Sequence, residues 1–378
     1  MKILLFDMDG VLVAPEGYHR ALAETVRLAG QALGYPEVSL TPEEIAAFEA
    51  AGVSSEWESS AICTALMLVQ AWEAELPRSL PEELPGAAAE AHGLPVPDFV
   101  AFMQRLARDG QERWTSAPER AEAALLTHRR LEQEKRRVVG DLLRRARDFD
   151  GSVTHRVFQE LALGSAEFER TYGRKPALGT ASYLEQHDRP GLSPAGAARL
   201  RAWLGRPSQH GAVFTNRPCR GPGGARGTPE AEAGVRCVGV PELPILGLGG
   251  LSWLAERRGA LTDELMKPSP VHALAALQLA AGRTAADALD LAAGLALDGL
   301  DGAAWRALDG ARVWIFEDSA KGLHSAQAAG ELLAAHGVTL ELTFCGVTTD
   351  SLKAQALTAA GARVFSGLEQ ALAVVPAF

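Results

Sequence analysis

Residues 2–10 read KILLFDMDG, an apolar run that closes on two acids and a glycine. Its first half is short and almost entirely apolar, which is typical of a strand buried inside a parallel sheet. Two acids, Asp7 and Asp9, follow the strand, and Gly10 permits a sharp turn of the backbone after them. Because open α/β sheets bind ligands at the carboxyl ends of their strands, the two acids form a candidate catalytic centre.

Outward from this strand, the sequence has almost wholly helical periodicity from residue 18 to residue 204. The helices that we expect are Tyr18–Leu33, Thr41–Ala51, Ala61–Glu75, Asp98–Ala107, Ala117–Phe149 and Pro194–Leu204. Residues 76–97 are rich in proline, so we expect a loop or a subdomain boundary there.

Short apolar runs bounded by turn residues return after residue 205, and helical stretches separate several of them. The expected strands are Ala212–Thr215, Val235–Val240, Val313–Phe316, Leu340–Val347 and Arg363–Ser366, and the expected helices are Val271–Ala281, Ala320–His336 and Ser351–Ala360. Strands that alternate with helices predict a parallel sheet covered on both faces. We therefore expect an α/β protein with a Rossmann-like parallel-sheet core, residues 1–15 and 206–378. A mostly α-helical cap domain, residues 16–205, is inserted after the first strand.

Polar residues mark three further places in the expected core. Thr215 and Asn216 end one strand, Lys267 precedes a helix in the run MKPSP, and Glu317 and Asp318 end the strand WIFED. Each feature alone is commonly structural: a threonine in a turn, a surface lysine, a helix N-cap. Together they offer a hydroxyl and an ammonium group for phosphate oxygens and carboxylates for a hard cation, which favours one shared site.

The motifs DMDGV (7–11), TN (215–216), KPSP (267–270) and FEDSAKG (316–322), in this order, resemble the haloacid dehalogenase superfamily. The most similar subgroup has a helical cap inserted after the first strand. The resemblance implies that Asp7 attacks phosphorus and becomes an aspartyl-phosphate. It also implies that Asp9 protonates the leaving oxygen and then activates the water that hydrolyses the intermediate.

The resemblance also implies a Mg²⁺ cofactor. The implied ligands are the Asp7 carboxylate, the backbone carbonyl of Asp9, and Asp318. Glu317 is expected either to support the metal or to orient Lys267. The groups expected to hold the transferring phosphoryl group are Thr215, the backbone of Asn216, and Lys267. We therefore expect a magnesium-dependent phosphatase that hydrolyses a small phosphomonoester.

Two alternatives to this function stay open. A phosphotransferase of the beta-phosphoglucomutase type shares the mechanism and also carries a histidine near the place of His19. Its cap has an arginine-bearing loop, whereas the nearest match here, residues 52–57 (GVSSEW), has no arginine. The other alternative is a non-catalytic protein that binds a phosphate ligand, which has no need for both Asp7 and Asp9. Dehalogenation is disfavoured, because dehalogenases lack an acid at the position of Asp9.

The expected cap is larger than is usual in this subgroup, and three of its residues are candidates for substrate contacts: His19, Glu56 and Trp57. Residues 51–58 interrupt the helical pattern where relatives place a loop that faces the substrate, although a tryptophan packed in an interhelical turn is common. The basic run 129–147 interleaves acids with bases at helical spacing, which is typical of a solvated helix face. A patch for an anionic substrate or another subunit is the alternative.

Bulk properties exclude several other classes of protein. The chain has 378 residues, of which 47% are hydrophobic and 22% charged, as in ordinary globular proteins. A net charge of -10 argues against broad binding to nucleic acid or anionic lipid. The four cysteines are scattered and suit neither a zinc site nor a disulfide framework. We see no membrane-spanning or signal-like segment and expect a cytoplasmic protein.

Overall fold

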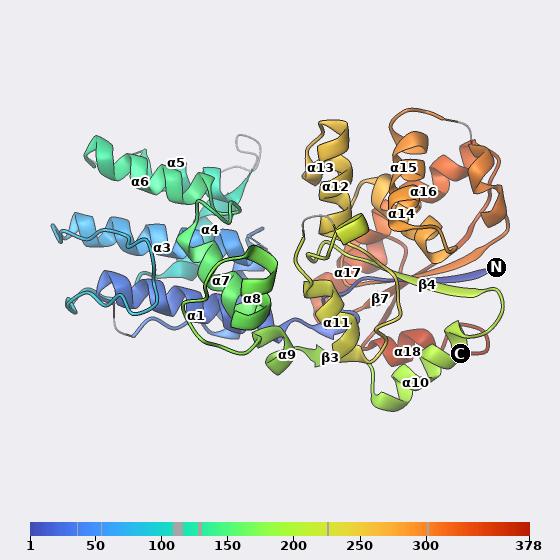
Figure 1. The fold of residues 1–378 in the computed structure, drawn as a ribbon, viewed down its shortest axis with the longest axis horizontal. Coiled ribbons are helices and arrows are strands. Elements are labelled where there is room, and N and C mark those ends of the chain that lie inside the picture. Colours follow the sequence, from blue (N-terminus) through green and yellow to red (C-terminus); the bar gives the residue numbers. More distant parts are fainter. Residues whose placement is uncertain (36, 54, 109–115, 128–130, 225–226, 301) are drawn as a thin grey trace. The chain divides into compact units, whose positions relative to one another are not determined.

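The fold is taken from a computed structural model, shown in Figure 1. The structure describes residues 1–35, 37–53, 55–108, 116–127, 131–224, 227–300 and 302–378. The chain forms two compact units: unit 1 consists of Met1–Pro15 and Asp188–Phe378, and unit 2 of Glu16–His187.

Unit 1 is built on a six-stranded sheet of order β5-β4-β1-β6-β7-β8, in which every neighbouring pair is parallel. The strands are β1 (Lys2–Phe6), β4 (Gln209–Phe214), β5 (Ile245–Leu246), β6 (Arg312–Glu317), β7 (Glu341–Val347) and β8 (Arg363–Phe365). The α/β class with a Rossmann-like parallel core and helical insertions is thereby confirmed.

Both faces of this sheet are buried. Ile3 and Leu5 pack into one apolar cluster, whereas Leu4 and Phe6 pack into another on the opposite face, as the alternation of side chains along a strand requires. The helices that contribute to the first cluster include α12 (Leu248–Arg258), α14 (Pro270–Ala280), α15 (Ala285–Ala296) and α16 (Ala320–Ala335). Those that contribute to the second are α10 (Pro194–Leu204), α11 (Glu230–Val238) and α18 (Leu368–Leu372). Further elements of unit 1 are η1 (Pro222–Gly224), α13 (Thr262–Leu265), η2 (Gly302–Leu308) and α17 (Ser351–Ala359).

The second boundary between the units lies earlier than the expected one after residue 205. Residues 188–204 belong to unit 1 for two reasons. The short strand β3 (Arg189–Pro190) pairs antiparallel with β2 (Val13–Ala14), directly after the first motif. Helix α10 then buries Leu200 and Trp203 in a cluster with the strands of the sheet. The expectation of a cap that extends to residue 205 was therefore wrong.

The expected strand at residues 235–240 was also wrong, because these residues contribute to helix α11 and the turn after it. The buried valines Val235 and Val238 are three residues apart, which suits one face of a helix and not the alternation of a strand. Gly239 ends the helix in the left-handed conformation, with a φ of +79°. The neighbour of β4 is instead the two-residue strand β5, which the sequence pattern did not reveal.

Every regular element of unit 2, within the described residues, is a helix. These helices are α1 (Glu16–Leu33), α2 (Pro42–Ala50), α3 (Glu56–Glu73), α4 (Phe99–Arg108), α5 (Ala117–Leu126), α6 (Gln133–Arg144), α7 (Val153–Leu163), α8 (Ser165–Tyr172) and α9 (Tyr183–His187). The single helix expected over residues 117–149 is replaced by α5 and α6. Leu125 of α5 and Val139 of α6 both belong to the apolar core of unit 2. Residues 128–130 lie outside the described residues.

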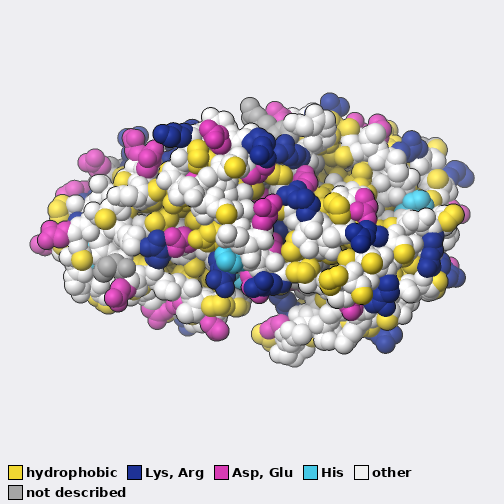
Figure 2. Space-filling model, turned by 60° about the horizontal axis from the view of Figure 1, so that its bottom comes forward, with side chains coloured by type: hydrophobic (Ala, Val, Ile, Leu, Met, Phe, Trp, Pro, Cys, Tyr) yellow, Lys and Arg dark blue, Asp and Glu magenta, His cyan; other side chains and the backbone are white. Residues whose placement is uncertain are grey.

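Two surface properties bear on the classes of partner. Among the helices that the structure describes, none has both the length and the apolar character needed to cross a membrane. On the face drawn in Figure 2, Lys and Arg side chains lie among Asp and Glu side chains.

Candidate active site

The site lies at the carboxyl end of the central strands of unit 1. Strand β1 lies between β4 and β6, with Phe6 level with Phe316. Asp7 follows β1, and its backbone N–H donates to the carbonyl of Phe316 at 2.9 Å. Since neighbouring parallel strands end at one edge of the sheet, the residues that follow β4 and β6 lie beside Asp7.

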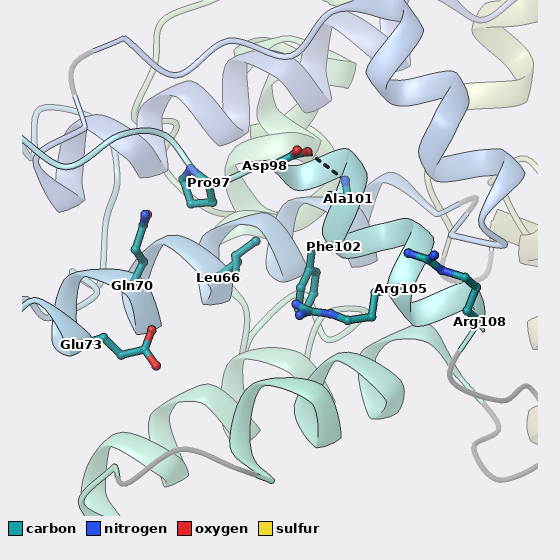
Figure 3. A pocket seen from close by; sticks show the side chains of 9 residues that line it. All are labelled: Leu66, Gln70, Glu73, Pro97, Asp98, Ala101, Phe102, Arg105 and Arg108. Carbon is teal, nitrogen blue, oxygen red and sulfur yellow. Dashed lines mark hydrogen bonds between the residues drawn. The ribbon is translucent and has the colours of Figure 1, made fainter.

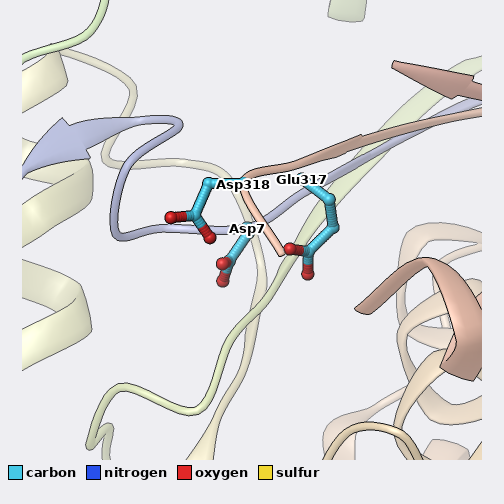
Figure 4. Close-up of side chains that lie close together, drawn as sticks. All are labelled: Asp7, Glu317 and Asp318. Carbon is cyan, nitrogen blue, oxygen red and sulfur yellow. The ribbon is translucent and has the colours of Figure 1, made fainter. Parts of the chain in front are cut away.

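Three carboxylates meet at this edge, and Figure 4 shows them projecting from two neighbouring strand ends. Asp7, Glu317 and Asp318 each offer an oxygen, and these oxygens all lie within 4.8 Å of one another. Burial and the repulsion by Asp7 raise the pKa of Asp318. A cluster of oxygen donors whose charges repel one another fits a small divalent cation, and Mg²⁺ takes carboxylate oxygens in this way.

Lys267 is buried between two of these carboxylates. Its Nζ lies 3.0 Å from Asp7 Oδ1 and donates to Glu317 Oε1 at 2.5 Å. Burial alone lowers the pKa of Lys267, but the attraction of the two carboxylates outweighs it and raises the pKa, so the side chain stays a cation. Nζ also lies 3.9 Å from the centre of the Phe214 ring at the end of β4. Lys267 therefore brings a fixed positive charge to the residue that is expected to attack phosphorus.

Glu317 is fully buried, and its two oxygens are used differently. One accepts from Lys267, and the other accepts from the backbone N–H and the hydroxyl of Ser319, both at 3.1 Å. Burial raises the pKa of Glu317, but three donors aimed at its oxygens stabilise the ionised form. Of the two roles expected for Glu317, this arrangement favours the one that orients Lys267.

Two glycines are required by the close approach of the carboxylates. Gly10 has a φ of +78°, and a Cβ built there would lie 2.6 Å from Asp318 Oδ2. A Cβ at Gly322, in the first turn of α16, would overlap Glu317 Oε1. Backbone therefore packs directly against carboxylate oxygens at both places, which the side chain of any other residue would prevent.

Asp9 lies beside a buried ion pair that the sequence did not predict. The Nη2 atom of Arg217 lies 2.9 Å from Asp9 Oδ1 and 2.9 Å from Asp188 Oδ2. The Asp9 side chain is 34% exposed, whereas those of Arg217 and Asp188 are 0% and 1% exposed. Desolvation raises the pKa of Asp9 to about 6, although Arg217 opposes the shift. A carboxyl group with such a pKa can give and take a proton near neutral pH.

Thr215 and Asn216 follow β4 as expected. The Thr215 N–H donates to the carbonyl of Leu246, and its Oγ1 accepts from the N–H of Arg217 at 3.1 Å. A hydroxyl that accepts in this way keeps its own hydrogen for another acceptor. Asn216 Oδ1 is buried and forms no hydrogen bond with the described residues. Phosphate binding by both residues stays a prediction.

A second lysine contacts the carboxylate cluster. Lys353, in α17, donates from Nζ to Asp318 Oδ2 at 2.7 Å, and its side chain is 49% exposed. Asp350 caps this helix by accepting from the backbone N–H of Lys353. Asp318, an expected metal ligand, is therefore neutralised by a side chain that solvent can reach.

The three expected substrate contacts of the cap all lie in unit 2. His19 contacts Glu49, with 3.3 Å between Nε2 and Oε1, and Glu56 is the first residue of α3. The Trp57 ring stacks on that of His155, with centroids 4.6 Å apart. Their contacts with a substrate stay predictions.

The basic run 129–147 forms ion pairs with nearby acids, as the solvated-face interpretation predicts. Arg129 and Arg130 lie outside the described residues. The described pairs include Lys135–Glu132, Arg137–Asp141, Arg144–Glu122, Arg145–Asp148 and Arg147–Glu58.

Unit 2 also contains a pocket of about 460 Å³ between α3 and α4, shown in Figure 3. Its lining residues are Leu66, Gln70, Glu73, Pro97, Asp98, Ala101, Phe102, Arg105 and Arg108. Arg105 lies over the Phe102 ring, and Asp98 accepts from the N–H of Ala101. The pocket includes none of the residues predicted for catalysis, metal binding or substrate contact.

Sequence reasoning named Asp7, Lys267, Glu317 and Asp318, which the structure brings together, and missed Arg217, Asp188 and Lys353. Arg217 immediately follows the TN motif, so its position was a usable signal. Asp188 and Lys353 had no such signal, because Asp188 lies within the expected helical cap and Lys353 within the expected helix Ser351–Ala360.

Comparisons with known proteins show the fold and no family. No protein-family model matches this sequence, and no curated protein matches it. A protein solved as a target of the Northeast Structural Genomics Consortium is similar over 99% of this chain and 98% of its own, with a TM-score of 0.65 and 18% identity. This likeness shows a shared fold.

Two further solved structures are similar at lower TM-scores, which show neither fold nor function. Phosphatase Tt82 from Thermococcus thioreducens is 14% identical, with 94% of this chain and 99% of that chain covered and a TM-score of 0.41. A hydrolase from Pseudomonas syringae is 12% identical, with 99% and 98% covered and a TM-score of 0.34.

Proposed function

We propose that this chain is a magnesium-dependent phosphatase of the haloacid dehalogenase superfamily, which hydrolyses a small phosphomonoester. The observation that carries the proposal is the convergence of Asp7, Lys267 and Asp318 at one edge of the sheet, with Asp9 two residues from Asp7. A nucleophile, a buried cation, a metal-ligand set and a proton donor are the parts that phosphoryl transfer to a carboxylate needs.

The charges of the site suit a dianionic ester. Asp7 and Asp318 would hold Mg²⁺ together with the Asp9 carbonyl, and a bound Mg²⁺ supplies positive charge that offsets the repulsion between phosphate and carboxylate. Lys267 supplies a second positive charge, already 3.0 Å from Asp7 Oδ1. Thr215 offers a hydroxyl hydrogen to a phosphoryl oxygen. This preorganised charge lets the carboxylate approach phosphorus.

In the first step, an Asp7 oxygen forms a bond to phosphorus while the bond to the ester oxygen breaks. The Asp9 carboxyl group donates its proton to that oxygen, so the product leaves as a neutral alcohol. The raised pKa of Asp9, about 6, keeps a useful fraction protonated near neutral pH.

In the second step, the Asp9 carboxylate takes a proton from a water molecule, whose oxygen then attacks phosphorus. The bond between phosphorus and Asp7 breaks, phosphate leaves, and both carboxyl groups return to their starting states. Lys267 stabilises the Asp7 carboxylate as it reappears.

The proposal is tested by phosphate release from a panel of phosphomonoesters, with Mg²⁺ and with EDTA. We expect turnover that requires Mg²⁺ and falls at least about 1000-fold in Asp7→Asn, which has lost its nucleophile. Asp290→Asn is the matched control, because Asp290 is an exposed residue of α15 whose 3.7 Å ion pair with Arg257 contributes little.

The other outcomes separate the alternatives. Equal turnover in wild type and Asp7→Asn contradicts the proposed nucleophile. Isomerisation of a sugar bisphosphate without net phosphate release would establish the mutase in place of the phosphatase. A folded protein that binds phosphate and Mg²⁺ but converts no ester would support the non-catalytic alternative.

A further inference from the structure

Arg217 is the centre of a buried charge cluster next to the proposed proton donor. One nitrogen, Nη2, contacts Asp9 and Asp188 at 2.9 Å each. The guanidinium group is fully buried, and its Nη1 lies 3.4 Å from the carbonyl of Glu230. A buried guanidinium costs much desolvation energy, which its carboxylate partners offset in part. Such a group has one orientation and can therefore fix the orientation of its partners.

The surrounding backbone holds Arg217 in place from both sides. Its N–H donates to Thr215 Oγ1, and its carbonyl accepts from the N–H of Leu248, the first residue of α12. Helix α11 leaves room for the side chain at Gly234, where a Cβ would lie 3.2 Å from Arg217 Nη1 and 2.5 Å from Met8 Sδ. The position of the guanidinium group is therefore set by three elements of unit 1.

Asp188 is fixed to the same segment of chain that carries Asp9. Strand β3 begins at the next residue, Arg189, and pairs with β2, while the N–H of Gly191 donates to the carbonyl of Leu12 at 2.6 Å. The contacts thus close a ring, from Asp9 along the chain to β2, across to β3, back to Asp188, and through Arg217 to Asp9. A closed ring resists rotation of any one side chain.

The exposure of the three side chains shows which side of the cluster is open. The side chains of Arg217 and Asp188 are buried, whereas the Asp9 side chain is 34% exposed. Asp188 and Asp9 contact the same nitrogen of Arg217. The Asp9 carboxyl group is therefore held through Oδ1, and its exposed part remains accessible to a reacting group.

We propose that Arg217, braced by Asp188, is a positioning residue that holds the Asp9 carboxyl group toward the ester oxygen. This inference rests on the proposed function, in which Asp9 gives a proton to the leaving group. A misplaced proton donor matters most when the leaving group is a poor one. An alkoxide needs the proton during bond cleavage, whereas p-nitrophenolate leaves readily without it.

The test compares kcat/KM for p-nitrophenyl phosphate with kcat/KM for the best alkyl phosphate of the panel. The variants are Arg217→Lys, Arg217→Ala and Asp188→Asn, with Asp9→Asn as the reference for a missing acid. We expect the alkyl ester to lose about 100-fold and the aryl ester about tenfold or less, so that their ratio shifts in the same direction as in Asp9→Asn. Added guanidinium should restore part of the alkyl activity in Arg217→Ala. Arg201→Lys, on the exposed face of α10, should leave the ratio unchanged.

An unchanged ratio in Arg217→Lys and Asp188→Asn would overturn the inference, as would equal losses with both esters. These two variants keep a charge or a shape in the cluster, so they decide the matter even if Arg217→Ala does not fold. A wild-type protein that hydrolyses neither ester contradicts the proposed function, and the inference with it. Hydrolysis of both esters with an unchanged ratio overturns the inference alone.

Discussion

At Gly10, one hydrogen atom in place of a methyl group lets the carboxylate cluster form. The substitution Gly10→Ala places a Cβ 2.6 Å from Asp318 Oδ2 and so displaces an expected metal ligand. We expect the affinity for Mg²⁺, measured by titration calorimetry, to fall about 10- to 100-fold. Gly337→Ala is the matched control, because its φ of +76° is close to that of Gly10, but no atom lies within 4 Å of its Cβ. Both variants pay about 1 kcal/mol of backbone strain, so only the loss of metal affinity separates them.

The ammonium group of Lys353 contacts Asp318, an expected Mg²⁺ ligand, and competes with a metal ion for this carboxylate. Its Nζ lies 2.7 Å from Asp318 Oδ2. We expect Lys353→Met to bind Mg²⁺ about three- to fivefold more tightly, because a half-exposed ion pair contributes up to about 1 kcal/mol. Calorimetry at low ionic strength measures the change, and Lys175→Met, in unit 2, controls for the loss of one positive charge. Weaker binding in Lys353→Met would mean that the lysine supports the metal site.

Whether a residue of the site could be predicted from sequence depends on how far along the chain its partners lie. Asp7, Thr215 and Glu317 could be predicted, because each directly follows an apolar run, and parallel strands bring their ends together. The bridge from Asp188 to Arg217 could not be predicted, since it depends on where the chain returns after unit 2. Sequence patterns carry local periodicity and contain no direct record of such pairings.

The end of helix α7 illustrates how one buried acid organises an element. Glu160 Oε1 accepts from the hydroxyl of Ser165 and the N–H of Leu178, and Oε2 accepts from the N–H of Ala177. In Glu160→Gln an amide NH₂ replaces one acceptor and faces a donor. We expect the free energy of unfolding, measured with urea, to fall by about 1–3 kcal/mol. We also expect the backbone amides of residues 177 and 178 to exchange hydrogen faster. Glu169→Gln, an exposed site in α8, should change neither; equal effects in both variants would contradict this role for Glu160.

The elements that the sequence misassigned share a physical cause. A strand of two residues such as β5 is too short to show any alternation, and its pairing with β4 alone defines it. Helix α11 contains a run rich in valine that reads as a strand until the spacing of its buried residues is known. Strand β1 and the helices α1 and α14 were predicted well, because β1 is uniformly apolar and the two helices are long enough to show their period.

The stability of the whole chain should depend on pH through a buried histidine. Burial lowers the pKa of His155 from its ordinary value near 6.5 to about 4. Between these values the unfolded chain binds a proton that the folded chain does not, so stability is lost as pH falls. The expected loss from pH 7 to pH 5 is about 2 kcal/mol from this group. His155→Phe keeps a ring against Trp57 and should remove that part of the loss, as chemical unfolding at both pH values would show. His324→Phe, at an exposed site, should leave the pH-dependent loss of stability unchanged. If His155→Phe loses as much stability between pH 7 and pH 5 as the wild type, His155 is not its source.

The two-unit organisation follows from the sequence in outline and from packing in detail. A helical region inserted between the first strand and the next predicts a second unit, and the chain does leave unit 1 after Pro15. The chain re-enters unit 1 at Asp188, because β3 pairs with β2 and α10 packs into the apolar cluster of the sheet.

The covalent attachment of the phosphoryl group to Asp7 can be detected chemically. Asp9→Ala should accumulate the intermediate with p-nitrophenyl phosphate and Mg²⁺, because this ester needs no proton donor and hydrolysis lacks its base. Acid quenching followed by borohydride reduction converts an aspartyl-phosphate to homoserine, which mass spectrometry locates in the sequence. We predict homoserine at position 7, dependent on ester and Mg²⁺ and absent in EDTA. Release of one equivalent of p-nitrophenol with Asp7 unmodified, or with homoserine at another position, would contradict the role of Asp7 as the nucleophile.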